Sequence, residues 1–455
     1  MTRLRVLVIV AALAAAACTE APRPRSAILV LLDTLRADRL GASGHRRPTT
    51  PALDRLAERG VLFEQVISYS AWTLPSVVAM LSGRFPTRRV FDETLRRSLV
   101  EDLRDAGFRT AAFTEGGFLS RYYGFDLGFE RYWDEAGGVH LGLRAPLQEL
   151  TGAGIESTFP AAEVWLRENA ERPFFLMVHT YEVHTPYYRR TFARDLPSGR
   201  LDPTLDSDDI GRIQSGALVL GETEYAYLDA LYDGGVLKAD DYVGRLLAAL
   251  DDLGIADSTL VIVTSDHGEE LEGRFPRFAA GHGHSLFDEL VRVPLILFDP
   301  TREYPVRRVA SQVRTVDVVP TILDLLGTAV EPSLDGRSLV PLMVGSERED
   351  RLAFSYLDLH GPERAAVRFA GFKLIRNLEA ARSAAARHSA LFDLRRDPAE
   401  RRDVSQKQPA ALQRASVQLD AVLERIDAEG RPSFPNITDV PDELQERLRA
   451  LGYVD

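Results

Sequence analysis

Cysteine is almost absent from this chain, and Cys18 is the only one among 455 residues. A single cysteine excludes an intramolecular disulfide, and we expect no cysteine nucleophile in the mature protein. Blocks of basic residues are also missing and the net charge is −12, which argues against a nucleic-acid partner. An anionic substrate would therefore have to be attracted by a local metal ion or by local cations.

The apolar run near the N-terminus, Val6 to Ala17, is too short to span a bilayer. Two arginines precede it and Cys18 follows it directly, an arrangement that resembles a bacterial lipoprotein signal. We therefore expect residues 1–17 to be a signal peptide and residues 18–25 to be a tether, lipidated at Cys18, that anchors an exported protein to a membrane. A plain secretory signal followed by a chance cysteine is the alternative, and it also implies export.

Strand-like and helix-like segments alternate along most of the chain. Short apolar runs predict buried strands at 27–32, 109–113, 174–178, 261–264 and 295–298. Helices are expected at 54–59, 76–81 and 316–326. This alternation predicts an α/β fold with a mostly parallel sheet that is covered by helices on both faces. We assign this domain to residues 26–350.

The pattern changes after about residue 351. Short strands separated by turns are expected at 365–369, 372–376 and 391–394, followed by an amphipathic helix at 412–426, a loop at 432–441 and a last helix at 442–451. Residues 351–455 are therefore expected to form a small C-terminal subdomain with an antiparallel sheet.

The segment Val261-Ile-Val-Thr-Ser-Asp-His-Gly-Glu269 carries the strongest functional signal. A buried strand ends there directly before Asp266 and His267, two side chains that can bind a metal ion. In open α/β sheets, ligands bind at the carboxyl ends of the strands. This placement favours a metal site over a capping or surface role for the pair.

Other polar residues also follow strands or begin helices. Asp33 directly follows a strand, where capping a helix is an alternative to binding a ligand. Thr73 precedes a Pro-Ser helix start, so its hydroxyl would either cap the helix or lie near N–H groups that favour an anion. Histidines gather in two segments, which contain His179, His184, His282 and His284. A core or surface position is the usual alternative for such histidines.

In their order along the chain, these segments resemble the sulfatase branch of the alkaline phosphatase superfamily. The matching motifs are strand-Asp33, Thr73-Leu-Pro-Ser, His184-Thr-Pro-Tyr, Ser265-Asp-His-Gly-Glu, Gly281-His-Gly and Val291-Arg-Val-Pro-Leu. The resemblance covers roughly residues 26–455 and implies an alkaline-phosphatase-like fold. It also implies an enzyme that cleaves a phosphate, phosphonate or sulfate ester with the help of one divalent metal ion.

The resemblance also implies roles for individual residues. Asp33, Asp266 and His267 would hold the metal ion, and Thr73 would be the metal-bound nucleophile. His184 and His282 would be catalytic residues that bind the oxygens of the transferred group or protonate the leaving alkoxide, and His179 and His284 are weaker candidates for these roles.

Position 73 departs from the sulfatase pattern. Sulfatases have a cysteine or serine there that is matured to formylglycine, with a proline two positions later and an arginine four positions later. Pro75 is kept, but Thr73 cannot give formylglycine, because oxidation at its Cβ would give a ketone, and the arginine position is Val77. A threonine here is closer to the zinc-dependent phosphoethanolamine transferases of the same superfamily, in which threonine carries the phosphoryl group.

This departure favours phosphorus over sulfur chemistry without formylglycine. Thr34 also stands where sulfatases often have a second aspartate, which favours Zn²⁺ or Mn²⁺ over Ca²⁺ or Mg²⁺. The alternative interpretation is a catalytically impaired, lipid-tethered protein that binds sulfated or phosphorylated envelope glycans. Residues 134–160 and 189–225 match no pattern, and we expect substrate-contacting loops there.

Overall fold

The structure is a computed structural model that describes residues 23–87, 98–134, 154–203, 205, 207–378, 389–431 and 440–451. The predicted signal peptide and most of the tether, including Cys18, lie outside the described residues, as do most of the loops predicted at 134–160 and 432–441. Among the described helices, none combines the length and the hydrophobicity needed to cross a membrane.

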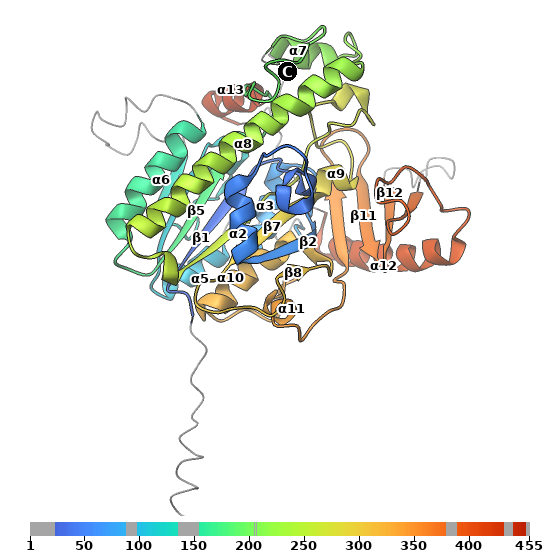
Figure 1. Ribbon diagram of the computed structural model, residues 1–455. Coiled ribbons are helices and arrows are strands. Elements are labelled where there is room, and N and C mark those ends of the chain that lie inside the picture. Colours follow the sequence, from blue (N-terminus) through green and yellow to red (C-terminus); the bar gives the residue numbers. More distant parts are fainter. Residues whose placement is uncertain are drawn as a thin grey trace, which may run out of the picture.

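A large mixed sheet forms the centre of the molecule (Figure 1). Its strands run in the order β4 (Arg131–Asp134), β3 (Arg109–Thr114), β5 (Phe174–Thr180), β1 (Ser26–Leu32), β6 (Thr259–Thr264), β7 (Arg292–Phe298), β2 (Val61–Ile67) and β8 (Arg308–Val309), and β9 (Val313–Arg314) also pairs with β2. Only β7 pairs antiparallel with its neighbours, β6 and β2. The other pairings in this sheet are parallel, as the alternating sequence pattern predicts.

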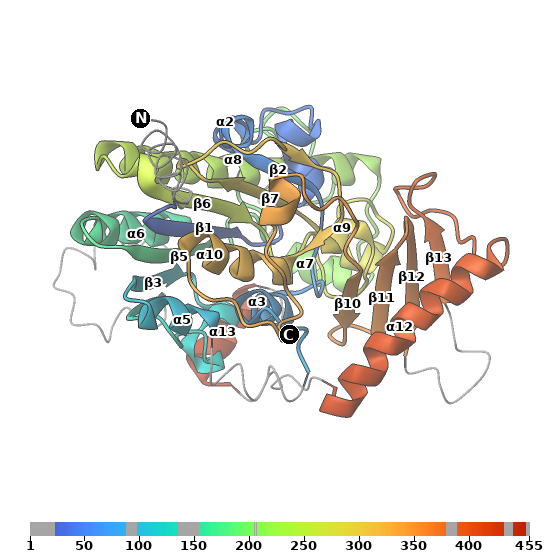
Figure 2. The same ribbon diagram turned by 90° about the horizontal axis from the view of Figure 1, so that it is seen from below.

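Side chains of the central strand β1 alternate between two hydrophobic cores, because successive residues of a strand point to opposite faces. Ala27, Leu29 and Leu31 belong to one core, and Ile28 and Val30 belong to the other. The first core is covered by α3 (Thr73–Ser82), α5 (Leu99–Asp105) and α10 (Val318–Leu326), and the second by α2 (Pro51–Arg59), α6 (Ile155–Asn169) and α8 (Glu222–Asp252) (Figure 2). A sheet that is buried on both faces explains why its strands are almost continuously apolar.

Three expectations about local structure are wrong. The segment 189–225 is not only loop, because it contains α7 (Ser207–Gln214) and the start of the long α8. The segment 134–160 is not only loop either, because α6 begins at Ile155. The helix expected from residue 76 begins at Thr73, so that threonine is part of the first turn of α3.

A second, four-stranded sheet follows the large one and is antiparallel throughout, as expected. It consists of β10 (Ala353–Leu357), β11 (Arg364–Phe369), β12 (Phe372–Asn377) and β13 (Ser389–Asp393), and α12 (Pro409–Glu429) packs against it. The short helix α9 (Asp288–Val291) directly precedes β7, and α11 (Val340–Met343) lies between the two sheets in the chain. The helix α13 (Asp442–Ala450) closes the described part.

The small sheet is hydrogen-bonded to the segment that leads into α3. Tyr356 N donates to Tyr69 O over 2.7 Å, and Ser355 Oγ donates to Ser68 O over 2.6 Å. In the opposite direction, Ser70 Oγ donates to Tyr356 O over 2.7 Å. Because these residues come directly before Thr73 in the sequence, the small sheet helps to hold the start of α3 in place.

Candidate active site and metal centre

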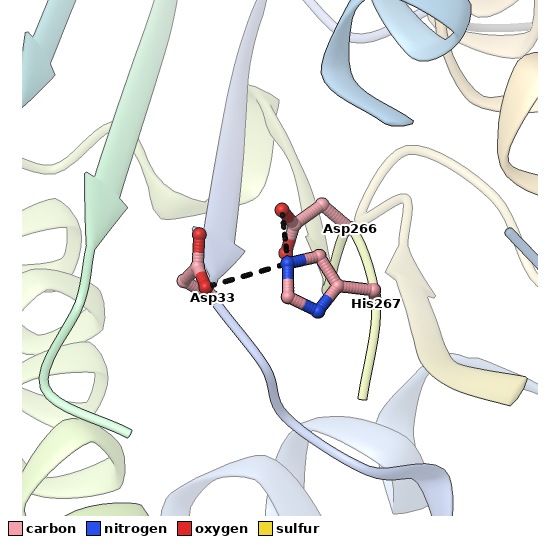
Figure 3. Close-up of side chains that lie close together, drawn as sticks. All are labelled: Asp33, Asp266 and His267. Atoms are coloured by element: carbon pink, nitrogen blue, oxygen red, sulfur yellow. Dashed lines mark ion pairs between the residues drawn. The ribbon is translucent and has the colours of Figure 1, made fainter. Parts of the chain in front are cut away.

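The side chains of two aspartates and one histidine meet where two neighbouring parallel strands end. Asp33 directly follows β1, while Asp266 and His267 follow β6. Their candidate ligand atoms all lie within 4.8 Å of one another, and all three side chains are buried (Figure 3). His267 Nε2 lies 3.8 Å from Asp33 Oδ1 and 3.4 Å from Asp266 Oδ2. The three residues therefore lie together at the carboxyl ends of neighbouring strands, where the sequence pattern puts them.

His267 is oriented as a metal-binding histidine usually is. Its Nδ1 lies 3.0 Å from the carbonyl oxygen of Gly268, so Nδ1–H is the donor and Nε2 is left as the ligand atom. A backbone carbonyl that fixes the second ring nitrogen is a common partner of such ligands. The ring therefore presents its lone pair to the two carboxylates.

Three of the four carboxylate oxygens of Asp33 and Asp266 have no hydrogen-bond partner among the described residues. Asp33 Oδ1 and both carboxylate oxygens of Asp266 are buried without a hydrogen-bond partner. Burial, together with the nearby Asp266 and Glu269, raises the pKa of Asp33 well above its usual value, although Thr73 opposes the shift. Buried carboxylates without such partners are costly, and a divalent cation removes the cost. The donor set of two carboxylates and one imidazole fits such an ion.

Thr73 lies against this cluster at the first position of α3. Its Oγ1 donates to Asp33 Oδ2 over 3.2 Å and lies 3.2 Å from His267 Nε2. The preceding Trp72 has an extended backbone, so the helix begins at Thr73 itself. The N–H groups and the dipole at the N-terminus of this ten-residue helix favour negative charge at the threonine oxygen.

The two histidines expected to be catalytic lie beside His267. The ring centroids of His282 and His267 are 4.5 Å apart, and those of His184 and His282 are 4.8 Å apart. Burial and the neighbouring histidines lower the pKa of His184 to about 3 and that of His282 well below its usual value. Both rings are therefore neutral near pH 7.

Of the two weaker candidates, His179 contacts the metal-site candidates, whereas His284 has other neighbours. His179 lies inside β5, not past its end, and its Nε2 is 3.2 Å from Asp33 Oδ2. His284 instead stacks on Phe278, with ring centroids 4.3 Å apart, and its Nε2 is 3.9 Å from Glu270.

Two residues of the cluster were not predicted. Glu269 Oε1 lies 2.9 Å from His282 Nδ1, and burial raises the pKa of this glutamate. Tyr181 packs edge-on against His179 and His184, with ring centroids 4.6 and 5.4 Å apart. A signal existed for Glu269, since it lies two positions after His267 in the same turn, but nothing in the sequence pairs it with His282.

Comparisons with known proteins agree with this geometry. The sulfatase family model matches residues 25–328, and the model of the C-terminal part of N-sulphoglucosamine sulphohydrolase matches residues 283–428. N-acetylgalactosamine-6-sulfatase of Canis lupus familiaris is 28% identical over 77% of this chain and 72% of its own length. The multifunctional alkaline phosphatase superfamily protein PehA of Trinickia caryophylli is 26% identical over 72% of this chain and 78% of its own.

Solved structures share the fold. The phosphonate monoester hydrolase of Agrobacterium radiobacter superposes with a TM-score of 0.65 at 23% identity, covering 90% of this chain and 96% of its own. A protein solved with its substrate D-glucosamine-2-N,6-O-disulfate gives a TM-score of 0.68 at 18% identity, covering 90% of this chain and 99% of its own. These likenesses confirm the alkaline-phosphatase-like α/β fold with a small second sheet. Because the sulfatase model spans more than half of the sequence and includes every residue of the cluster, the chain belongs to the sulfatase family, a family of ester hydrolases in the alkaline phosphatase superfamily.

Proposed function

We propose that this protein is a metal-dependent hydrolase or transferase that cleaves an anionic ester through nucleophilic attack by Thr73. The observation that carries the proposal is the position of Thr73 Oγ1, 3.2 Å from Asp33 Oδ2 and 3.2 Å from His267 Nε2. A divalent ion held by Asp33, Asp266 and His267, with Thr73 as a further ligand, would polarise the ester and lower the pKa of the hydroxyl.

The nucleophile favours phosphorus over sulfur. Formylglycine cannot form from Thr73, so the sulfatase route through an aldehyde hydrate is closed to this chain. A threonine alkoxide can attack a phosphate or phosphonate ester directly and form a covalent ester with Thr73. Relatives and fold neighbours include both sulfatases and phosphonate monoester hydrolases, so we place phosphate and phosphonate esters first and sulfate esters second.

The reaction proceeds in two displacements. In the first, the bond from Thr73 Oγ to phosphorus forms, the bond to the leaving oxygen breaks, and the threonine proton passes to the leaving alkoxide. In the second, water or an alcohol attacks, the bond to Thr73 breaks, and the proton of the attacking group returns to Thr73 Oγ. The covalent step divides one difficult displacement into two easier ones.

His184 and His282 are suited to carry the proton in these steps. Nδ1 of His184 contacts the carbonyl oxygen of Thr185, and Nδ1 of His282 contacts Glu269. These acceptors place the ring hydrogen on Nδ1, which leaves Nε2 of each neutral ring as a proton acceptor. A group that accepts a proton in one step can donate it in the next.

Substitution of Thr73 tests the proposal. Thr73→Val keeps the shape but removes the hydroxyl, and we expect its kcat to fall by at least about 1,000-fold, whereas Thr73→Ser retains activity. Ser82→Ala, at the other end of the same helix, is the matched control and should leave kcat unchanged. Rates are measured on an aryl sulfate, a phosphate monoester, a phosphate diester and a phosphonate monoester, with Zn²⁺, Mn²⁺ and Ca²⁺ added separately.

Mass spectrometry of a quenched reaction with a slowly cleaved aryl phosphate diester gives the second readout. We expect the peptide that contains Thr73 to carry the phosphoryl group together with the ester substituent that the first displacement leaves in place, and we expect no such adduct in Thr73→Val. If Thr73→Val keeps wild-type activity on every ester, the proposed nucleophile is wrong.

A binding protein without turnover is the second candidate. It is favoured by Val77, which stands where the resemblance implies an arginine, and by the loss of the formylglycine precursor. If no ester is cleaved with any metal, but a sulfated or phosphorylated glycan binds equally well to the wild type and to Thr73→Val, this candidate replaces the enzyme.

We also propose that the enzyme is exported and anchored through a lipidated Cys18. The basis is the N-terminal run that ends at this cysteine. Incorporation of labelled fatty acid into the wild type but not into Cys18→Ser is the expected result, and equal labelling of both proteins would contradict it.

A further inference from the structure

The last helix, α13, leaves the small sheet and packs against the catalytic part of the molecule (Figures 1 and 2). It contacts the 3-10 helix η3 (Gly117–Leu119), which follows β3 at the same edge of the sheet as the metal-site residues. A Cβ at Gly117 would lie 2.9 Å from Tyr181 Oη and 3.0 Å from Leu451 Cδ1. Glycine is therefore required for the close packing of α13, η3 and Tyr181.

This packing brings the end of α13 close to residues of the candidate active site. Tyr181 is in contact with His179 and His184, as described above. Leu451 lies in the wall of a cavity that also exposes the catalytic candidate His282. The other lining residues are Thr185, Gln214, Phe278, Ala279, Ala280, Gly281 and His360. Leu451 and residues next to the catalytic candidates His184 and His282 thus line one cavity.

Arg447 precedes Leu451 by four positions, so the two side chains lie on the same face of this helical segment. Its Nε atom is buried although the residue as a whole is only half-buried. Burial, His184 and then the charge of Arg447 lower the pKa of His179, and Arg447 opposes the rise in the pKa of Tyr181 and of Tyr188. His179 and Tyr181 are buried but Tyr188 is 61% exposed, so the charge of Arg447 is close enough to act both on the buried cluster and on a tyrosine at the surface.

A cation at this place meets a need of the proposed reaction. The cluster itself contains the carboxylates of Asp33, Asp266 and Glu269 and neutral histidines, and Val77 stands where the resemblance implies an arginine. An anionic ester is repelled by such carboxylates unless cations compensate for them. The planar guanidinium group is well suited to binding phosphate or sulfate oxygens through two hydrogen bonds.

We propose that Arg447 binds the negatively charged group of the substrate at the entrance of the site, so that α13 is part of the active site. This inference rests on the proposed function, because it needs an anionic ester as the substrate. Arg447 acts in binding and orienting the substrate, and it takes no part in proton transfer.

The test compares two arginines of the same helix in the full-length, metal-loaded protein. In Arg447→Ala we expect KM for an aryl phosphate, and the dissociation constant of inorganic phosphate measured by calorimetry, to rise by about 10- to 100-fold, with a smaller change in kcat. Arg449→Ala is the matched control, because Arg449 is exposed on α13, and both constants should stay at their wild-type values. Arg447→Lys should recover part of the phosphate affinity.

Two results would overturn the inference. One is a phosphate affinity that is the same in Arg447→Ala as in Arg449→Ala. The other is an equal loss in Arg447→Ala and Arg447→Lys together with a lower melting temperature, which would show a structural role. Because phosphate binding is measured without turnover, the failure of the Thr73 nucleophile would be seen separately, in the rate of Thr73→Val.

Discussion

Two clusters of buried carboxylates can be compared in this molecule, and they are built in opposite ways. In the candidate metal site, Asp33 and Asp266 have His267 as their common neighbour, and no lysine or arginine forms an ion pair with them among the described residues. The second cluster joins the catalytic part to the small sheet. There Asp288 lies 2.8 Å from Lys373 and 2.9 Å from Arg368.

The pKa values of the two aspartates move in opposite directions. Burial, reinforced by neighbouring acids, raises the pKa of Asp33 well above its usual value. Burial also opposes ionisation of Asp288, but Arg368 and Lys373 outweigh it and lower the pKa to about 2. Lys373 also pairs with Glu400, but this one cation does not outweigh the effect of burial there. Burial raises the pKa of Glu400 to about 7.

The comparison separates a structural role from a functional one. Cations of the chain itself neutralise Asp288, and the result is a fixed contact between α9 and the small sheet. Within the described part of the chain, the carboxylates of Asp33 and Asp266 have no such cations, and we infer that they are kept available for a cationic ligand. Four predictions follow from this contrast.

The largest effect is expected from removing one charge in each cluster. Asp266→Asn should lower kcat/KM by about 1,000-fold, because several kcal/mol of transition-state stabilisation by the metal ion are lost. In the presence of a chelator, the same change should not reduce the free energy of unfolding, since an uncompensated buried charge is removed. Asp288→Asn is the matched control and should lower the free energy of unfolding. Destabilisation of the metal-free protein by both changes would contradict the contrast.

Loss of the lysine should destabilise the contact between α9 and the small sheet. Lys373→Met leaves two buried carboxylates with one fewer cation, and breaking a buried ion pair in this way costs about 3 kcal/mol. Urea unfolding measures the change. The kcat of the folded fraction should stay near the wild-type value, and a protein as stable as the wild type would show that the lysine does not stabilise the contact.

The pH dependence of stability should follow Asp288. Its folded pKa of about 2 lies below the unfolded value of about 4, so the stability that it contributes is present above about pH 4 and is lost as the pH falls through the folded pKa. Between about pH 5 and pH 3, the free energy of unfolding should therefore fall more steeply in the wild type than in Asp288→Asn. Urea unfolding at several pH values measures this free energy. If it falls equally with pH in the wild type and in Asp288→Asn, the assignment to Asp288 is wrong.

The smallest effect is expected at the surface. Arg308 lies 2.8 Å from Glu64, but both side chains are well exposed to solvent. Arg308→Ala should change the free energy of unfolding by less than about 1 kcal/mol, because water and salt screen such pairs. If Arg308→Ala lowers the free energy of unfolding as much as Lys373→Met does, burial does not explain the difference between the two ion pairs.

Much of the fold, and the clustering of Asp33, Asp266 and His267, could be predicted from the sequence. Apolar runs that end at Asp33 and at Asp266 identify both the strands and the edge of the sheet where ligands bind, because parallel strands present their carboxyl ends together. The start of α3 was placed three residues late, since proline and serine are frequent in the first turn of a helix and do not fix its first residue.

Contacts between segments far apart in the sequence could not be predicted in this way. The pairing of Glu269 with His282, and that of Tyr356 with Tyr69, depend on how loops and sheets pack in space. His179 was expected past the end of its strand, and only the extension of β5 to Thr180 explains why its ring meets Asp33. Local patterns identify which residues can do chemistry, but packing decides which of them meet.

Metal content tests the central claim most directly. The purified wild-type protein, dialysed against buffer without chelator and measured by inductively coupled plasma mass spectrometry, should contain about one divalent ion per chain, with Zn²⁺ or Mn²⁺ favoured. Asp266→Asn should lose this ion, while Asp288→Asn should keep it. A wild-type protein that cleaves its ester at full rate without any divalent ion would contradict the account.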